Sequence, residues 1–143
     1  MKYSYQGTRE NIAKAKKTSE AVSPKKTMET CRAIRGMKAD KAIKYLEEVI
    51  EGGKHVPYTK HRKKMPHQKK GSPGGYPKKS AEKVKETIKS ALNNAENQGL
   101  DTENMKIVHS AAHKTISIRK PPGKLRNKST KLTNIEIILK QNN

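Results

Sequence analysis

Lysine and arginine are the residues of this chain whose number and spacing could do chemistry, and they gather in two stretches without any acidic residue. Residues 52–81 hold nine of these cations and residues 104–135 hold eight, which together supply +17 of the formal net charge of +20. The other 81 residues carry 16 basic and 13 acidic side chains and are close to neutral. Cations clustered in this way neutralise phosphates and release counterions, so the pattern predicts a near-neutral body with two extensions that bind a polyanion.

The kind of cation favours contact with a phosphate backbone over reading of base edges. Lysine outnumbers arginine 27 to 6, and a lysine ammonium is a point charge without the bidentate geometry of a guanidinium. A pI of about 10.1 with clustered cations is the electrostatic footprint of a nucleic-acid-binding protein. The residues predicted to contact nucleic acid are the following cations and histidines of the two stretches: Lys54, His55, Lys60, His61, Arg62, Lys63, Lys64, Lys69, Lys70, Lys78, Lys79, Lys114, Lys128 and Lys131.

The sequence contains no arrangement of residues that indicates catalysis. The chain shows no Ser/His/Asp arrangement and no pair of carboxylates in an apolar setting. Gly74-Gly75 is not followed by the Lys-Ser/Thr of a phosphate-binding loop. We therefore expect a protein that is not an enzyme and that has no cofactor and no small-molecule substrate.

Histidine and cysteine do not suggest a metal site either. His109 and His113 are four residues apart, as in a helical metal site, but they fall in a segment with strand periodicity and lack a third ligand. A structural role or contact with RNA is the simpler expectation for both. The remaining candidates have no zinc-ligand spacing: His55, His61, His67 and Cys31.

The composition also bounds the core and the compartment. The chain is 31% hydrophobic and has no Trp or Phe, so about 80–90 residues can share a small aliphatic core. The basic stretches are expected to be poorly ordered without a partner.

No window is apolar enough for a membrane span, and the N-terminus lacks the apolar region of a signal peptide. Cys31 is the only cysteine and is expected in the core, which fits a reducing compartment such as the cytoplasm. Neither basic stretch has the apolar face of a membrane anchor.

A pair of helices is predicted over residues 23–51, directly before the first basic stretch. Ser23 and Pro24 supply an N-cap and a proline at the first helical position. The first helix ends at Gly36 and carries an apolar stripe at spacings of three: Met28, Cys31 and Ile34. The second helix is predicted over residues 39–51, ends at Gly52-Gly53, and carries one apolar stripe: Ala39, Ala42, Ile43, Leu46, Val49 and Ile50.

Residues 54–79 are predicted to form an extended basic loop, because proline and glycine at this density rule out a long regular element. A long helix then follows over residues 80–98, with Gly99 after it. Its predicted buried stripe consists of Ala81, Val84, Ile88, Ala91, Leu92 and Ala95.

After Gly99 the apolar period falls to two, which predicts an extended β-hairpin over residues 105–140 with Pro121-Pro122-Gly123 near its tip. Its first strand is expected to place Ile107, His109 and Ala111 on one face and Val108, Ser110 and Ala112 on the other. Its second strand alternates Ile135, Ile137 and Leu139 with Glu136 and Ile138. Tyr3-Ser4-Tyr5 is a candidate for a further short strand.

Short segments along nearly the whole chain match one known family in the same order. They are CRAIRGMK at residues 31–38, KYLEEVI at 44–50, VPY at 56–58, YPKKSA at 76–81, NNAE at 93–96, GLD at 99–101, IVH at 107–109 and IEIIL at 135–139. This ordered set resembles the L-22 family of large-subunit ribosomal proteins, called L-17 in eukaryotes, in its archaeal and eukaryotic branch. One such match would be weak, but the set is specific.

The resemblance implies an α+β fold: a single small domain over residues 1–143, with three helices packed on an antiparallel sheet and a long protruding β-hairpin. It implies a place on the outer surface of the large subunit of the cytoplasmic ribosome, near the peptide exit. The implied partners are large-subunit ribosomal RNA (rRNA), neighbouring ribosomal proteins and, near the hairpin tip, the nascent polypeptide.

The hairpin tip is the part of the chain that departs from the family pattern. Residues 121–126 read PPGKLR, where the family has a proline-arginine-alanine tip and a glycine-arginine pair, and the hairpin is a few residues shorter than usual. The residues that the resemblance places at the tip, near the wall of the exit tunnel, are Arg119, Lys120, Pro121, Pro122, Gly123, Lys124, Leu125 and Arg126.

The sequence thus predicts a structural rRNA-binding protein that supports assembly of the large subunit and helps to line the exit tunnel. Two other classes of protein stay open at this point. One is a non-ribosomal basic RNA- or DNA-binding protein, such as an RNA chaperone. The other is an interaction protein for an acidic partner or a membrane surface.

Overall fold

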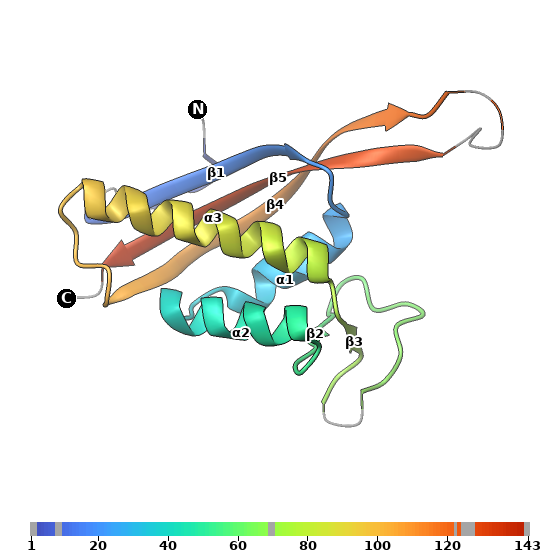
Figure 1. The fold of residues 1–143 in the computed structure, drawn as a ribbon, viewed down its shortest axis with the longest axis horizontal. Helices are drawn as coiled ribbons and strands as arrows, with labels where there is room; N and C mark the ends of the chain where they lie inside the picture. Colours follow the sequence, from blue (N-terminus) through green and yellow to red (C-terminus); the bar gives the residue numbers. More distant parts are fainter. Residues whose placement is uncertain (1–2, 8–9, 69–70, 122, 124–127, 142–143) are drawn as a thin grey trace.

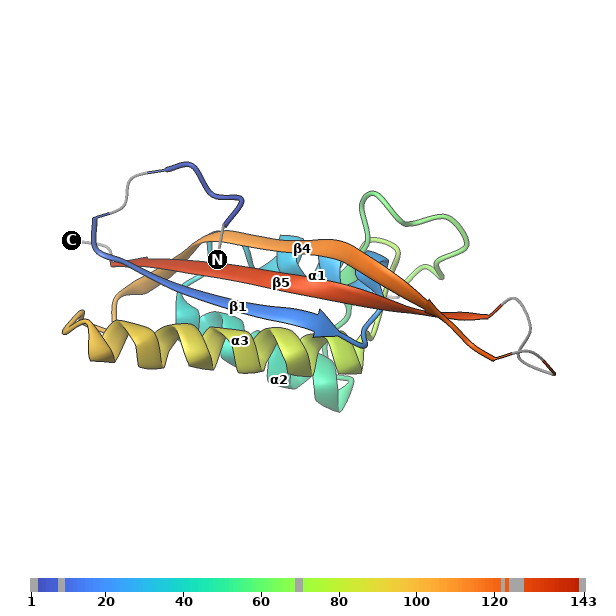
Figure 2. The same ribbon diagram turned by 90° about the horizontal axis from the view of Figure 1, so that it is seen from above.

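The protein is an antiparallel sheet with helices on one face, seen in a computed structural model that describes residues 3–7, 10–68, 71–121, 123 and 128–141. Its elements in chain order are β1 (Ile12–Glu20), α1 (Pro24–Ile34), α2 (Ala39–Glu51), β2 (Val56–Pro57), β3 (Gly74–Gly75), α3 (Lys78–Asn97), β4 (Met105–Arg119) and β5 (Ser129–Gln141). The main sheet has the strand order β1-β5-β4; α1 and α3 pack on it, and α2 packs on α3 (Figures 1 and 2). The predicted α+β class with a protruding hairpin is confirmed.

The central strand of the sheet is β5, and both of its faces are buried in the body. Ile135, Ile137 and Leu139 join the core under the helices, as their alternation predicted. Glu136 and Ile138 point to the opposite face and are buried as well. Because β5 pairs with β1 on one side and β4 on the other, it has no free edge over the length of the body.

The first strand of the structure is β1, which the sequence analysis missed. Tyr3-Ser4-Tyr5 does not form a strand; the segment lies across the face of the sheet that the helices leave open (Figure 2). β1 was hard to recognise because two of its three buried apolar positions are alanine: Ala13 and Ala15 are buried, with Lys14 between them and two lysines after them. Such small side chains give a weak period-two pattern, so the pairing with β5 decides the strand.

The helices follow the predicted periodicity closely. α2 begins at Ala39 and ends at Glu51, as expected, and Gly52 takes a left-handed φ of 95° that lets its N–H bond to the carbonyl of Glu48. α3 begins two residues earlier than predicted, at Lys78, and ends at Asn97. The buried stripes of both helices are confirmed, with Ile43, Ile50 and Leu92 at their half-buried margins.

One residue of the predicted stripe on α1 is not in the core. Cys31 and Ile34 are buried as expected, whereas Met28 is 37% exposed. Thr27 and Thr30 take the buried positions instead, and each hydroxyl donates to a carbonyl four residues earlier. Two threonines can line the core because those bonds satisfy their hydroxyls inside the helix.

A β-bulge reverses the predicted faces of β4. The pairing with β5 shifts between Ile107 and His109, which leaves Val108 without an opposite residue. Beyond the bulge, Ser110 and Ala112 therefore share the buried face with Ile107, while His109 and Ala111 turn to the other face. The alternation predicted from sequence was wrong from Val108 onward, because a simple period of two does not include an extra residue.

The basic loop between α2 and α3 is held to the body more firmly than its composition suggested. β2 pairs with β3, and a Cβ at Gly74 would lie only 2.3 Å from the carbonyl oxygen of Val56, so this close pairing requires glycine. Val56 and Tyr58 are buried in the main core. The expectation of a poorly ordered loop thus fails for the segment that contains them.

No helix within the described ranges is both long enough and apolar enough to cross a membrane.

A buried carboxylate fastens the N-terminal segment to the open face of the sheet. The carboxylate of Glu136 on β5 forms an ion pair with Lys16 Nζ at 2.7 Å. It also accepts hydrogen bonds from the backbone N–H of Ser4 at 3.0 Å and from the Ser4 hydroxyl at 2.7 Å. Burial alone would raise the pKa of Glu136, but these partners outweigh it and hold the pKa at about 2.

We expect Glu136→Gln to lower the free energy of unfolding at neutral pH by roughly 3 kcal/mol, from the gap between the folded pKa of about 2 and an ordinary value of about 4.3. Since the folded pKa is the lower one, the stabilisation is complete above about pH 4.3 and disappears as the pH falls towards 2. Urea unfolding of both proteins across this range measures it. The exposed Glu103→Gln is the control, and a gap between Glu136→Gln and wild type that does not shrink in acid would contradict this account.

Candidate nucleic-acid interface

The cations predicted on the loop are almost all on the surface. Lys54, Lys60, Arg62, Lys63 and Lys64 are exposed, as are Lys78 and Lys79 in the first turn of α3. The two histidines, His55 and His61, are half-buried. Lys69 and Lys70 lie outside the described residues.

The cations predicted on the hairpin lie on a ribbon that leaves the body entirely. Every residue of β4 from His113 to Arg119 is exposed, and Ile116 and Ile118 are 66% and 54% exposed. Lys114, Arg119, Lys120, Pro121, Gly123, Lys128 and Lys131 are all exposed on this ribbon. Four predicted tip residues lie outside the described residues: Pro122, Lys124, Leu125 and Arg126.

The loop and the hairpin project from the same end of the molecule, opposite the end where β5 finishes (Figures 1 and 2). The structure thus brings together two basic stretches that are separated in sequence by the whole of α3. Both can face one large polyanion at once, because the near-neutral sheet and helices hold them in a fixed relation.

Very few of these cations have an acidic partner within the protein. Lys54 pairs with Glu48 at 2.7 Å. None of the other predicted cations that the structure describes has a carboxylate within ion-pair distance. The surface ion pairs lie instead among β1, α2 and α3, as between Lys17 and Glu86 and between Lys85 and Glu47. The positive charge of the loop and the hairpin is therefore available to an external anion.

One buried acidic residue on α1 holds the backbone of the basic loop by hydrogen bonds. The carboxylate of Glu29 on α1 is 2% exposed and accepts three consecutive backbone N–H groups, those of residues 59–61, at 3.0–3.1 Å. Burial alone would raise the pKa of Glu29, but the hydrogen bonds from residues 59–61 outweigh burial and lower it. Glu29 thus fixes the loop backbone from which Lys60 and Arg62 extend.

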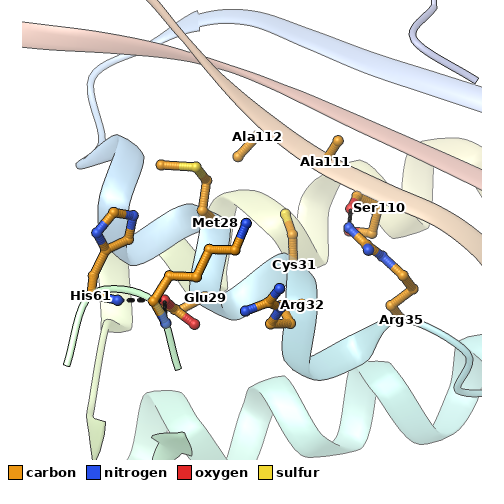
Figure 3. A pocket seen from close by; sticks show the side chains of 10 residues that line it. Met28, Glu29, Cys31, Arg32, Arg35, His61, Ser110, Ala111 and Ala112 are labelled. Carbon is orange, nitrogen blue, oxygen red and sulfur yellow. Dashed lines mark hydrogen bonds between the residues drawn. The ribbon is translucent and has the colours of Figure 1, made fainter. Parts of the chain in front are cut away.

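A cleft of about 210 Å³ lies between α1, the loop and β4 (Figure 3). Arg32 and Arg35 from α1 and Lys60 and His61 from the loop line it, with Met28 at its apolar side. The charge pattern of the sequence does not single out the two arginines, because Glu29 precedes them and they lie outside the acid-free stretches. Only the fold shows that Glu29 bonds to the loop backbone while the arginines border the cleft.

A second cleft, of about 280 Å³, lies where the chain enters α1 and α3. Lys26, Lys78 and Lys79 line it together with the exposed ring of Tyr76. Lys26 was also missed, since it belongs to the near-neutral part of the sequence. Tyr58, the other aromatic residue of the loop, is buried and cannot offer its ring to a base.

His109 and Cys31 take structural positions. His109 contacts the hydroxyl of Ser4 at 3.0 Å and lies against the ring of Tyr5, and burial raises the pKa of the Cys31 thiol to about 11. Within the part of the chain that the structure describes, no group of three or more His, Cys, Asp or Glu side chains could hold a metal ion.

We expect Glu29→Gln to loosen the loop, because a carboxamide offers one acceptor oxygen and an N–H₂ group where the carboxylate meets three N–H donors. The free energy of unfolding should fall by about 1–3 kcal/mol, and amide exchange at residues 59–61 should accelerate in the variant. The lowered pKa means that the stabilisation is present above about pH 4.3 and is lost as the pH falls. Hydrogen exchange with Glu51→Gln as the exposed control tests this; unchanged rates at residues 59–61 would refute the anchor.

Comparison with known proteins agrees with these features. The family model described as "Ribosomal protein L22p/L17e" matches residues 15–140. The chain is similar to proteins named "Large ribosomal subunit protein uL22" from two archaea: 40% identical to that of Methanopyrus kandleri, over 92% of this chain and 88% of the relative, and 41% identical to that of Methanosphaera stadtmanae, over 96% and 94%. The matched residues include both basic stretches, all three helices, and the strands except for the first residues of β1 and the last residue of β5. The chain therefore belongs to the L22p/L17e family of ribosomal proteins.

Proposed function

We propose that the protein is a structural constituent of the large ribosomal subunit and binds rRNA through its loop and its hairpin. The observation that carries the proposal is the set of exposed cations on two extensions at one end of the body, which, apart from Lys54, have no acidic partner among the described residues. Phosphate neutralisation by such a surface does not depend on base sequence, so the shape of the folded RNA decides where the protein binds.

The hairpin is the part of the protein that requires a partner. From Ser117 opposite Lys131 outward, its two strands are held among the described residues by their own ladder alone, and apolar side chains such as Ile116 and Ile118 are exposed. A two-stranded ribbon of this kind is marginal in water. We infer that it threads between rRNA helices, which cover both faces, and that its tip reaches the nascent polypeptide at the exit-tunnel wall.

The contact residues follow from this placement. On the loop we assign rRNA contact to the predicted cations and to His55 and His61, and on the hairpin to Lys114, Lys128 and Lys131 and to the tip residues 119–126. Neighbouring ribosomal proteins would meet the near-neutral surface of α2 and α3, where the acidic side chains lie. No step of this role calls for catalysis, and the site of action is the cytoplasmic ribosome.

Co-sedimentation with large subunits distinguishes this function from a free nucleic-acid-binding role. A tagged copy expressed in an archaeal host should stay with the large subunit in about 0.5 M salt, where non-specific phosphate contacts weaken steeply. A free RNA chaperone or compacting protein would instead leave the particle and bind duplex DNA as tightly as rRNA at equal salt. Binding that survived nuclease treatment would point to an acidic partner or a membrane.

The loop cations should show in the salt dependence of binding. We expect Lys63→Glu with Lys64→Glu to reduce the slope of log K against log salt by about 1.4–1.8, the value for two lost phosphate contacts. Filter binding of purified protein to large-subunit rRNA between about 50 and 200 mM salt measures the slope. Lys41→Glu with Lys44→Glu on α2 is the control with the same charge change; equal effects of the two pairs would argue against a localised interface.

The exposed isoleucines of the hairpin should matter for assembly and not for folding. Ile116→Ser with Ile118→Ser should leave the free energy of unfolding within about 0.5 kcal/mol of wild type, because both side chains are already in water. Incorporation into large subunits should fall, since the ribbon then loses apolar contact with its surroundings in the particle. Val108→Ser, an exposed apolar position of β4 inside the body, serves as the control, and full incorporation of the double variant would contradict the threading of the hairpin.

A further inference from the structure

The cleft beside α1 lies where the outer edge of β4 first loses its cover. Nearer the start of β4, the turn between α1 and α2 occupies this edge: Gly36 N–H donates to the carbonyl of Ile107 at 2.9 Å, and Ile107 N–H donates to the carbonyl of Met37 at 2.9 Å. Next along the edge, the guanidinium of Arg35 donates to the carbonyl of Ser110 at 2.8 Å. The cleft opens from there, along residues 110–112.

Two guanidinium groups at this cleft each have one hydrogen-bond partner in the protein. Arg35 donates to the carbonyl of Ser110 (Figure 3), and Arg32 donates from Nη1 to the hydroxyl of Thr59. Each guanidinium carries five N–H donors, so one such bond leaves others for a ligand. Because the side chains are already held, a ligand that stacks on them or bonds to them loses little of its binding free energy to side-chain ordering.

The remaining walls combine positive charge with apolar surface. Lys60 and His61 come from the loop, and Met28 comes from α1 with 37% of its surface exposed. Ala111 and Ala112 leave room on the β4 side because their side chains are small. The one carboxylate in the lining, that of Glu29, is turned to the backbone of residues 59–61 and accepts hydrogen bonds there.

We propose that this cleft holds one unpaired nucleotide of the bound RNA, with its base between Met28 and the arginines and its phosphate at Lys60 and His61. The inference rests on the proposed function and adds to it a site that reads an extruded base. Unpaired RNA bases are recognised by stacking on guanidinium planes and on aromatic rings such as histidine, and extruded bases also by stacking on apolar side chains. This cleft offers all three in one place.

The shape and lining of the site argue against the simpler occupants. A duplex presents its phosphates on a convex surface, and a recess bordered by a helix, a loop and a strand does not admit it. An inorganic anion would use the cations but would leave the exposed apolar surface of Met28 without a partner. A nucleotide has both an anionic group and a flat apolar face, and so uses both walls.

Chemical probing of the RNA tests the proposal. Full-length protein is bound to deproteinised archaeal large-subunit rRNA, and acylation of the 2′-hydroxyl groups is mapped with wild type, Met28→Glu, Met28→Leu and Asn93→Glu. Met28→Glu puts a carboxylate into the cleft, Met28→Leu keeps an apolar wall, and Asn93→Glu makes the same charge change on the exposed surface of α3. Thermal unfolding of each variant shows whether it has kept its fold.

We expect wild type to change the reactivity of an unpaired nucleotide, and Met28→Glu to lose this one effect while the rest of its footprint stays. Overall affinity should fall by about tenfold in Met28→Glu, within the range for loss of one base stack, and should stay near wild type in Met28→Leu and Asn93→Glu. If all four proteins give the same footprint, the cleft is not a nucleotide site, although the protein still binds rRNA. If wild type gives no footprint at all, the proposed function itself fails and the cleft site with it.

Photo-crosslinking gives an answer that does not depend on a variant. The wild-type protein is bound to rRNA that contains 4-thiouridine, irradiated, digested, and its crosslinked peptides are identified by mass spectrometry. Crosslinks on α1 near Met28 or on residues 110–112 support the site. Crosslinks that occur on the loop and hairpin yet spare both of these segments would overturn it.

Discussion

The backbone ladder between β4 and β5 is the interaction on which the rest of the structure depends. Inside the body it is supported on both sides: β1 pairs with the far edge of β5, and the turn between α1 and α2 pairs with the outer edge of β4. Outside the body the same ladder continues from Ser117 opposite Lys131 to Arg119 opposite Ser129, where no other described element packs on it. Order in the basic ribbon is therefore carried outward from the core, because a free ribbon of two strands would not hold its own shape.

Two buried glutamates explain how segments with little apolar content are held to this body. Glu29 fixes the backbone of residues 59–61, and Glu136 fixes Ser4 and Lys16 across the open face of the sheet. Each carboxylate replaces lost hydration with several hydrogen bonds, which is why the pKa of each lies below its ordinary value despite burial. Both acids are used inside the protein, so neither neutralises the cations of the loop and the hairpin. An acid-free surface and an ordered backbone can thus occur together.

The sequence predicted the elements that have a strong period and missed those that depend on pairing or packing. α2 was located residue for residue because leucine, valine and isoleucine mark its stripe and a glycine ends it. β1 was missed because alanine and lysine alternate too weakly, and the faces of β4 were wrong because the bulge at Val108 is a property of the pair and not of one strand. The positive charge of the loop and the hairpin was predictable from sequence alone, since a stretch without acids stays basic in any fold; its contact with RNA is a proposal. Arg32, Arg35 and Lys26 were not predictable, because their acidic neighbours in sequence point elsewhere in space.

The exposure of Met28 relates the apolar stripe of α1 in the sequence to the cleft in the structure. Its spacing with Cys31 and Ile34 is that of a core residue, and the helix does turn these two toward the sheet. Thr27 and Thr30 can replace it in the core because their hydroxyls bond to the carbonyls of their own helix. The exposed part of Met28 borders the same cleft as Arg32 and Arg35, and we infer that a bound ligand covers it there. α1 departs from its predicted stripe at the residue that borders the cleft. On the proposal made above, Met28 contributes its apolar surface to the nucleotide site, while Thr27 and Thr30 fill the core in its place.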